Sequence, residues 1–355
     1  MENEKKNELR AVDFFCGAGG MTCGMSLAGI KVLAGIDNDP DCKETYVINN
    51  PASKYIEKDI KKYSEKELAE EIGITKNDDS LIFIGCSPCQ YWTRINTNRN
   101  KSFETKDLLK EFRRFVEWFK PGYVVVENVP RFLKYKDENV LGDFIVFLEN
   151  ESYKCDPASI NANLYGVPQN RNRFLLIATR VSNYIQIPKG EPDDKLVVRN
   201  FIGTHKGFQA IEAGHRDETD FIHTSANLSE NNKKRIQKTK KDGGDRYGWK
   251  DDSELQIGAY RGKDDYFKDV YGRMFWDKPA PTITTRFNSL SNGRFGHPEE
   301  DRAISLREGA TLQTFPKTYV FKGPSLASIS RQIGNAVPPE LAKRIGGAIV
   351  KNYYQ

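Results

Sequence analysis

Short apolar runs alternate with amphipathic stretches through the first half of the chain, and this alternation restricts the fold more than any other feature. The runs are apolar almost throughout, which is typical of strands that helices cover on both faces. We expect strands over Arg10 to Phe15, Lys31 to Ile36, Leu81 to Gly85, Tyr123 to Val126 and Phe174 to Ala178. We expect helices over Gly20 to Ala28, Asp41 to Asn49, Glu65 to Ile72, Thr105 to Phe119 and Val140 to Glu149. The pattern predicts βαβ units and a mostly parallel sheet in an α/β fold.

The pattern changes in the second half of the chain. Residues 182–292 are rich in Gly, Asp, Lys and Asn, with scattered aromatic residues and little periodicity. Helical patterns return over Ser305 to Thr314 and over Pro338 to Tyr353, where two prolines begin the helix. We therefore expect a second, irregular domain that begins at about residue 182.

Composition and charge narrow the class of protein. The first ten residues are polar, and no apolar stretch is as long as a membrane span, so we expect a cytoplasmic protein without a membrane partner. Its six cysteines should be free thiols in that compartment. Residues 231–250 hold eight basic and two acidic residues, a local net charge of +6 in a chain whose net charge is +5. Such a segment suits a polyanion, although a solvated surface is an open alternative.

Three polar motifs follow the expected strands. Four residues of the turn from Asp13 to Met21 are Gly or Ala. Glycines let the backbone approach a ligand closely. A dinucleotide fingerprint needs a third glycine at position 22, where this chain has Thr, so a nicotinamide oxidoreductase is a poor match. Asp37, which ends the second strand, can bind the two hydroxyls of a ribose. Lys58-Asp59-Ile60 lies near the end of a further expected strand, the third along the chain. It combines an acid with an apolar neighbour, which suits an adenine.

The segment from Gly85 to Gln90, Gly-Cys-Ser-Pro-Cys-Gln, follows an apolar strand. Its Cys-x-x-Cys spacing invites a zinc or redox interpretation. The chain has no second paired-cysteine motif, and its four histidines lack ligand spacing, so we predict no metal. A buried, inert thiol is the other structural alternative.

Pro88-Cys89-Gln90 resembles the nucleophile motif of the DNA cytosine-5 methyltransferase family, and further motifs follow in the family's order. Val126-Glu127-Asn128-Val129 resembles the glutamate-asparagine-valine motif, and the segment from Gly166 to Arg173 resembles the paired-arginine motif. The segments from Arg302 to Pro316 and from Arg331 to Pro339 resemble the last two blocks. The resemblance covers residues 10–180 and about 278–350, and the unmatched middle is where the family keeps its variable target-recognition region.

The resemblance implies a Rossmann-like, S-adenosylmethionine-dependent catalytic domain, formed by residues 1–181 and 325–355, and a target-recognition domain, formed by residues 182–324. It implies methyl transfer to carbon 5 of a cytosine flipped out of a specific double-stranded DNA sequence, through a covalent Cys89 adduct. S-adenosylhomocysteine would be the second product. The bacterial, restriction-modification type is the best match, and it suggests a monomer in the bacterial cytoplasm, with any companion endonuclease acting separately.

The resemblance also assigns roles to individual residues. Glu127 would stabilise charge at ring nitrogen 3. Arg171 and Arg173 should point opposite ways along an extended segment, and we expect Arg173 near the cytosine or the thiol. Pairing of both arginines with structural carboxylates is the alternative. The expected S-adenosylmethionine site comprises Phe15, Gly17, Ala18, Gly20, Asp37, Asn38, Asp59, Ile60, Pro88, Leu108, Asn335, Ala336 and Val337.

The sequence leaves open two alternative functions and the identity of the residues that contact the bases. One rival is methylation of RNA, since a tRNA-modifying branch shares most of these motifs. The other is a catalytically silent DNA-binding protein, against which the intact Cys89, Glu127 and Arg173 argue. We expect Trp249 and Trp276 to lie in the core of the smaller domain, and a role as wedges is the alternative. Candidates for contacting guanine edges are Arg246, Arg261, Arg273 and Arg286.

Overall fold

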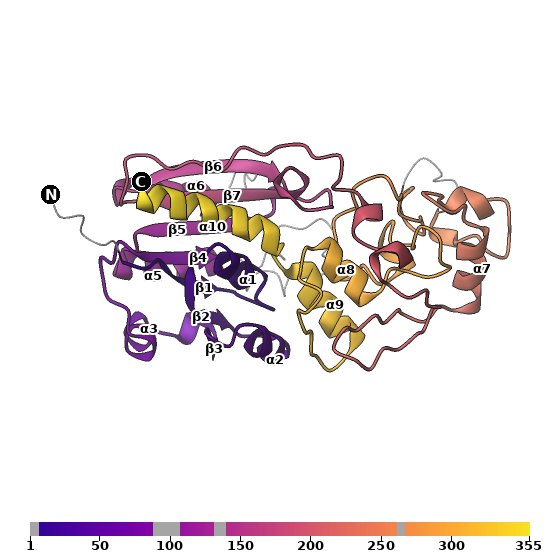
Figure 1. The fold of residues 1–355 in the computed structure, drawn as a ribbon, viewed down its shortest axis with the longest axis horizontal. Helices are drawn as coiled ribbons and strands as arrows, with labels where there is room; N and C mark the ends of the chain where they lie inside the picture. The colour runs from indigo at the N-terminus through magenta and orange to yellow at the C-terminus, as the bar shows by residue number, and fades with distance from the viewer. Residues whose placement is uncertain (1–6, 88–106, 131–139, 261–266) are drawn as a thin grey trace. The chain divides into compact units, whose positions relative to one another are not determined.

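The computed structural model describes residues 7–87, 107–130, 140–260 and 267–355. Its contacts divide the chain into two compact units, which Figure 1 shows as ribbons. The first unit comprises Met1–Asn161, Asn172–Glu191 and Val337–Gln355, and the second comprises Ala162–Arg171 and Pro192–Ala336. Among the residues within these described ranges, no helix is long and apolar enough to cross a membrane.

The first unit is built on a seven-stranded sheet with the order β3-β2-β1-β4-β5-β7-β6. The strands are β1 (Arg10–Phe14), β2 (Lys31–Asp37), β3 (Lys54–Glu57), β4 (Leu81–Gly85), β5 (Tyr123–Asn128), β6 (Lys154–Asn161) and β7 (Asn172–Thr179). Neighbouring strands from β3 to β5 are parallel, whereas β7 runs antiparallel to β5 and to β6. The predicted α/β fold is therefore confirmed.

Helices cover both faces of the sheet (Figure 1). They are α1 (Gly20–Leu27), α2 (Pro40–Asn49), α3 (Glu65–Ile72), α5 (Leu108–Phe119), α6 (Val140–Asn150) and α10 (Pro339–Tyr354), with the 3-10 turn η1 (Ile60–Lys62). Side chains of α3, α5 and α6 share one core with alternate strand residues such as Phe14 and Phe83, whose rings lie 5.1 Å apart. On the opposite face α10 packs against α1. A Cβ atom on Gly24 would lie 2.3 Å from the carbonyl oxygen of Pro339, so only glycine permits this approach.

The five expected strands with stated bounds are present, and β3 is the further strand expected before Lys58, but β6 was not expected from the sequence. It forms the edge of the sheet, most of its residues are only partly buried or exposed, and it contains Pro157. Edge strands tolerate proline and need no continuous apolar run, so the hydrophobic pattern that identifies inner strands is missing here.

The second unit consists mainly of loops, as predicted. Its helices are α7 (Glu230–Lys238), α8 (Leu306–Leu312) and α9 (Leu326–Asn335), of which α7 and α9 were not expected. Its 3-10 turns are η4 (Ala162–Tyr165), η5 (Val198–Asn200), η6 (Thr204–Lys206), η7 (Arg246–Trp249), η8 (Gly258–Tyr260) and η9 (Leu290–Asn292). Trp249 lies in a core cluster with Ile236 and Tyr271, and Trp276 is also buried, as expected of both tryptophans.

The division of the chain differs from the expected domain boundaries at three places. Residues 162–171, which were expected in the first domain, belong to the second unit. Residues 325–336 belong to the second unit, because α9 packs against α8 there. Residues 182–191 stay with the first unit, where the Ile187 amide donates to Asp156 at 2.6 Å. The return of the chain to the first unit therefore begins at Val337 rather than at residue 325.

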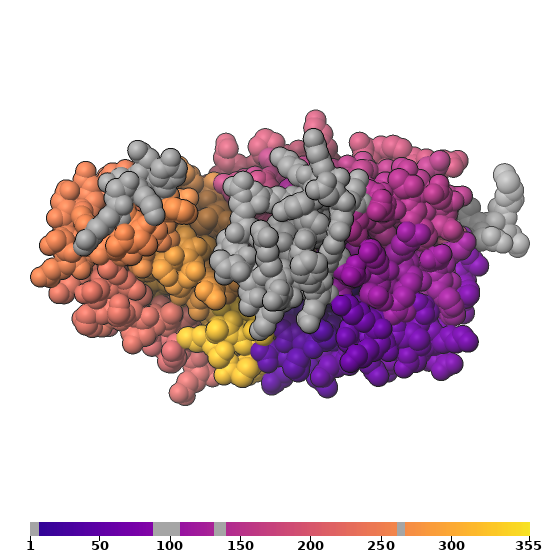
Figure 2. Space-filling view, turned by 180° about the vertical axis from the view of Figure 1, so that it is seen from behind, coloured from indigo at the N-terminus to yellow at the C-terminus, as the bar shows by residue number. Residues whose placement is uncertain are grey.

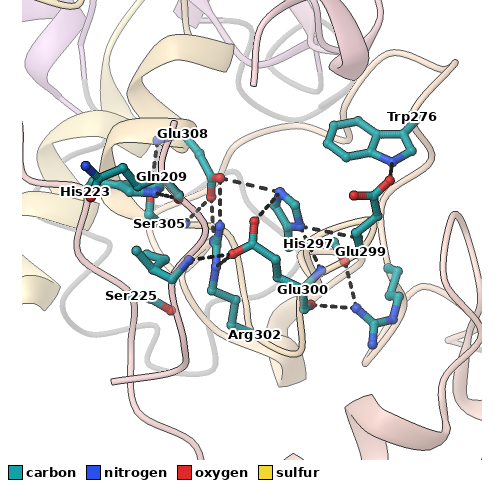
Figure 3. Close-up of polar contacts among 12 residues, drawn as sticks. Gln209, His223, Ser225, Trp276, His297, Glu299, Glu300, Arg302, Ser305 and Glu308 are labelled. Atoms are coloured by element: carbon teal, nitrogen blue, oxygen red, sulfur yellow. Dashed lines mark hydrogen bonds and ion pairs between the residues drawn. The ribbon is translucent and has the colours of Figure 1, made fainter. Parts of the chain in front are cut away.

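A buried polar network stabilises the second unit around α8 (Figure 3). Arg302 donates to both carboxylate oxygens of Glu308, at 2.7 and 2.9 Å, and neither side chain is exposed. Ser305 and Glu308 form the capping box of α8, and the Ser305 hydroxyl also contacts His223 at 2.9 Å. Burial alone would raise the pKa of Glu308, but Arg302 holds it well below its usual range.

Candidate active site

The order of the strands identifies where a ligand should bind in the first unit. The chain crosses from β1 outward to β2 and β3, then returns to the other side of β1 with β4 and β5. In open parallel sheets, ligands bind outside the carboxyl ends of the strands at this point of reversal. The carboxyl ends of β1 to β5 lead directly into the motifs that the sequence singled out, so these motifs share one edge of the sheet.

The glycine turn after β1 folds back onto the end of β2. Phe15 has φ +62°, Gly17 φ +51° and Gly19 φ +84°, and the amides of Phe15 and Cys16 donate to the carbonyl oxygen of Ile36 at 2.8 and 3.2 Å. A Cβ atom placed on Gly17 would meet no described atom within 4 Å. Gly17 therefore borders open space, as the backbone of a ligand-binding turn should. Ala18 and Gly20 are buried in the same turn and at the start of α1.

Asp37 holds this turn with its carboxylate. Oδ2 accepts a hydrogen bond from the Gly17 amide at 2.8 Å, and Oδ1 accepts one from the Asp39 amide at 2.9 Å. Burial raises the pKa of Asp37 above its ordinary value. Each oxygen can accept a further hydrogen bond, so the residue suits a pair of neighbouring hydroxyl groups. Asn38, the next predicted residue, is exposed.

The adenine motif lies at the end of β3. The Lys58 amide donates to the carbonyl oxygen of Asp37 at 3.0 Å, which brings the two predicted motifs together. Asp59 caps the turn η1 by accepting from the Lys61 amide at 3.0 Å. Ile60 is buried, and Phe15 and Leu108 are partly buried against the core cluster to which Ile60 belongs. Three predicted apolar residues of the cofactor site, Phe15, Ile60 and Leu108, thus belong to or pack against one core.

Glu127 and Arg173 form an ion pair at the end of β5. The Arg173 Nε lies 2.9 Å from Glu127 Oε1, and their side chains are only 14% and 9% exposed. The side-chain amide of the neighbouring Asn128 donates to the backbone and side-chain oxygens of Ser87, both at 3.4 Å. This contact ties the end of β5 to the residue that precedes the predicted nucleophile motif. Pro88 and Cys89 themselves lie outside the described residues.

Arg171 and Arg173 have separate partners, as their alternation in the sequence predicted. Arg171 is buried and donates to the carbonyl oxygens of Ile283, Gly334 and Ala336 at 3.1, 3.3 and 3.1 Å. These contacts are with backbone, in the segment of Ile283 and at the end of α9. Asn335 and Ala336 belong to this helix end in the second unit, and Val337 begins the last segment of the first unit.

Asp13 is a buried residue in this region to which the sequence analysis gave no role. Its Oδ2 accepts from the Thr22 hydroxyl at 2.7 Å, whereas its Oδ1 is buried without a hydrogen-bond partner among the described residues. Burial raises the pKa of Asp13 to about 7. The sequence does carry a signal for Asp13, because it is an acid inside an otherwise apolar strand, where burying an ionised carboxylate is costly.

The structure separates the arginines that were candidates for reading bases. Arg273 was a wrong candidate, because it is fully buried and its guanidinium donates to four backbone carbonyls, including those of Ile236 and Thr239 at 2.8 and 3.0 Å. Arg246 is also buried, and Arg261 lies outside the described residues. Arg286 is exposed, so it alone among the described candidates can approach a base edge.

The basic segment of the second unit is divided into paired and unpaired lysines. Lys233 pairs with Glu230 at 3.0 Å, and Lys238 pairs with Asp252. Four exposed lysines of the segment form no ion pair with another described residue, namely Lys234, Lys240, Lys241 and Lys250. Figure 2 shows this part of the unit in salmon to orange. These four side chains are available to phosphate groups.

Comparisons with known proteins cover nearly the whole chain. Residues 9–351 match the family described as C-5 cytosine-specific DNA methylase. The chain is 39% identical over 345 residues to the type II methylase M.HgiDII of Herpetosiphon aurantiacus, covering 95% of this chain and 94% of that protein. It is 30% identical to the type II methyltransferase M1.HphI of Haemophilus parahaemolyticus, covering 97% and 87% of the two chains.

Solved structures resemble the chain at lower identity. A prophage-encoded protein of E. coli, described as a DNA modification methyltransferase, has a TM-score of 0.72 at 20% identity and covers 98% of this chain and 100% of its own. The S. pombe Dnmt2 methyltransferase has a TM-score of 0.61 at 17% identity, with coverage of 97% and 99%. These likenesses confirm the expected Rossmann-like methyltransferase fold.

Proposed function

Because this chain belongs to the C-5 cytosine-specific DNA methylase family, and is therefore a DNA cytosine-5 methyltransferase, we propose that it is the modification enzyme of a type II restriction-modification system. Its target would be one cytosine within a short, specific sequence of double-stranded DNA. The observation that carries this proposal is the ion pair of Glu127 with Arg173, beside the strand that leads to Cys89. The names of relatives that cover nearly their whole length support the biological setting.

We propose S-adenosylmethionine as the methyl donor, bound at the carboxyl ends of β1 to β3. The open space at Gly17 and the two-point carboxylate of Asp37 suit the ribose and its neighbouring backbone. Asp59 and Ile60 would hold the adenine, with Phe15 and Leu108 as its apolar neighbours. When bound, this group supplies an electrophilic methyl and leaves as S-adenosylhomocysteine.

Cys89 would supply the nucleophile. Carbon 5 of cytosine is a weak nucleophile, so the thiolate first adds to carbon 6, and the new sulfur–carbon bond pushes electrons toward carbon 5 and ring nitrogen 3. After carbon 5 has been methylated, a base removes its hydrogen as a proton. The electrons of that carbon–hydrogen bond restore the ring double bond, and the bond to Cys89 breaks to release the thiolate.

Glu127 would stabilise the charge that develops at nitrogen 3 during the addition. Arg173 holds the Glu127 carboxyl from one side, because its Nε lies 2.9 Å from Oε1, and we assign it this positioning role. The side chain of Asn128 would position the nucleophile motif, because it contacts Ser87, the residue before Pro88. The end of β5 would thereby align the acid and the nucleophile, whose alignment controls the rate.

Recognition of the DNA would belong to the second unit. The target base is stacked inside a duplex, so it must be flipped out before a thiol can reach it. Lys234, Lys240, Lys241 and Lys250 would contact phosphates, and Arg286, the exposed one among the described candidates, would contact a guanine edge.

The test is transfer of tritium from labelled S-adenosylmethionine into plasmid DNA or tRNA, followed by bisulfite sequencing of the plasmid. Label should enter DNA, and one recurring sequence should be protected. Label that enters tRNA instead would support the RNA-modifying alternative. Label in neither, with intact DNA binding, would support a silent DNA-binding protein.

The nucleophile is tested by comparing two neighbouring cysteines. Cys89→Ser should abolish turnover and spare the fold, since a serine hydroxyl is far less nucleophilic than a thiol, whereas Cys86→Ser should retain activity. DNA with 5-fluorocytosine at the target should trap the parent enzyme covalently in the presence of S-adenosylmethionine, because fluorine cannot leave as a cation. A trapped complex that forms equally well with Cys89→Ser would remove Cys89 from the mechanism.

A further inference from the structure

Phe267 is an exposed aromatic residue on the surface of the second unit. Its side chain is 64% exposed, the largest fraction among the exposed large hydrophobic residues of the described chain. Its backbone has φ +55°, in the left-handed region that favours glycine. A bulky side chain at this φ is strained, and such strain persists mainly at functional sites. Exposure and strain both cost stability, so folding alone does not account for phenylalanine at this position.

Phe267 belongs to a pair of aromatic rings. The centres of the Phe267 and Tyr260 rings lie 6.0 Å apart. The guanidinium of Arg246 lies 5.2 Å from the centre of the Tyr260 ring, a distance at which a cation and a ring attract. Arg246 is buried, so Tyr260 links the exposed Phe267 to an interior side chain of the unit.

Two lysines lie beside the neighbouring ring of Tyr247. The ammonium groups of Lys250 and Lys268 are 5.4 and 6.0 Å from its centre, and all three residues are exposed. Lys268 directly follows Phe267, and Tyr247 directly follows Arg246, so the rings and the lysines form one patch. We name it the aromatic-basic patch, and its members are Tyr247, Lys250, Tyr260, Phe267 and Lys268.

The turn that carries Phe267 is held in place. The Val270 amide donates to the carbonyl oxygen of Phe267 at 3.2 Å. Arg294, whose side chain is only 12% exposed, donates to the Asp269 carboxylate at 2.9 Å and to the carbonyl oxygen of Lys268 at 3.4 Å. The ion pair also neutralises Asp269, an acid that would otherwise repel a polyanion.

Arg294 connects this turn to a second basic segment. Its guanidinium also donates to the carbonyl oxygens of Gly243 and Gly244, at 2.8 and 3.1 Å. These glycines belong to the loop that begins with the exposed Lys240 and Lys241. One side chain thus fixes the exposed phenylalanine next to lysines that are available to phosphate groups.

We infer that the aromatic-basic patch contacts the DNA duplex, with the Phe267 ring packed on bases and the ammonium groups of Lys250 and Lys268 at phosphates. This inference rests on the proposed function, in which the second unit recognises DNA. Aromatic rings stack on bases of any sequence, and apolar side chains that enter a base step unstack and bend a duplex. Because the turn is already held, the ring loses little conformational entropy when it binds.

The experiment measures the dissociation constant of a DNA duplex by fluorescence anisotropy at several salt concentrations. The duplex carries the sequence that bisulfite sequencing of the plasmid identifies. The variants are Phe267→Ala, Phe267→Gly, Phe267→Trp and the double variant of Lys250→Gln with Lys268→Gln. Tyr184→Ala is the matched control, because Tyr184 is an aromatic residue of the first unit with a similar exposure of 62%. Thermal unfolding and binding of S-adenosylhomocysteine are measured for each variant.

We expect Phe267→Ala to raise the dissociation constant of the duplex about tenfold without changing its dependence on salt, because stacking releases no counterions. Phe267→Trp keeps a stacking ring and should bind nearly as well as the parent. The double lysine variant should reduce the salt dependence instead. Phe267→Gly should bind DNA as weakly as Phe267→Ala but unfold at a higher temperature, since glycine relieves the strained φ. Tyr184→Ala should bind like the parent.

The inference and the proposed function fail by different outcomes. If the parent methylates the duplex and Phe267→Ala binds it with parent affinity, the patch lies away from the DNA and the proposed function stands. If Phe267→Ala loses affinity for S-adenosylhomocysteine in parallel with its loss of DNA affinity, Phe267 is a structural residue. If the parent neither binds nor methylates duplex DNA, the proposed function fails and the inference fails with it.

Discussion

At the scale of single residues, the buried carboxyl of Asp13 should make stability depend on pH. Its pKa is raised from 3.8 to about 7 by burial, so the folded state keeps a proton that the unfolded chain releases. The stability contribution is complete below pH 3.8 and is lost as pH rises toward 7, a total on the order of 4 kcal/mol.

We therefore expect the stability of Asp13→Asn, which cannot ionise at this position, to increase relative to that of the parent protein as pH rises. The difference between their free energies of unfolding should move by about 3 kcal/mol in favour of the variant between pH 5 and pH 8. Urea denaturation at both pH values measures it. A constant difference would mean that Asp13 does not titrate in this range.

Asp37 is the residue on which the cofactor proposal most depends. Asp37→Ala should weaken S-adenosylmethionine binding by about 1–3 kcal/mol, the scale of hydrogen bonds to a charged group. Asn38→Ala, which changes its exposed neighbour, should have a smaller effect and serves as control. Calorimetry that finds parent-like affinity in folded Asp37→Ala would exclude it from the site.

At the scale of elements, two helices begin with the same capping box in different surroundings. Ser64 and Glu67 cap α3 at the surface, whereas Ser305 and Glu308 cap α8 in the interior, where Glu308 also neutralises Arg302. The shared sequence pattern predicts both helix starts, but only the second carries a buried ion pair. Removing one partner of such a pair leaves a buried charge without compensation.

Glu308→Gln should consequently destabilise the second unit by about 3–5 kcal/mol, because Arg302 loses its counter-charge. Glu67→Gln makes the same chemical change in an exposed capping box and should have a much smaller effect. Thermal unfolding of both variants compares them directly. Equal losses of stability would show that the ion pair contributes nothing beyond the cap.

At the scale of the whole molecule, the distribution of charge matters more than the net charge of +5. Replacing Lys234, Lys240, Lys241 and Lys250 by glutamine should weaken DNA binding and reduce its dependence on salt, by about one unit of slope for each phosphate that a lysine no longer neutralises. Affinity for S-adenosylhomocysteine should not change.

The matched control replaces Lys233 and Lys238, whose charges Glu230 and Asp252 already balance. That double variant should show a smaller decrease in slope per lysine than the quadruple one. Binding isotherms measured between about 50 and 200 mM salt give the slope of the binding constant against salt concentration on logarithmic axes. A quadruple variant with the parent slope would identify the segment as a solvated surface only.

The sequence alone determined the inner sheet and the motifs at its edge. Inner strands are buried on both faces, so their apolar runs are visible without any knowledge of neighbours, and parallel strands place their carboxyl ends together. Asp37, Asp59 and Glu127 could therefore be assigned to one edge before the structure was known. Strand β6 could not be recognised in this way, because an edge strand has no obligatory apolar pattern.

Only the tertiary structure decided which polar residues are exposed and which bind each other over long distances. Arg273 and Arg286 are alike in sequence, yet one is fully buried and the other exposed. The Gln169 side chain donates to Gln313 at 2.6 Å across 144 residues, and no local spacing indicates such a pair. Local periodicity reports the burial of apolar groups, whereas the partner of a polar group depends on where the folded chain places its donors and acceptors.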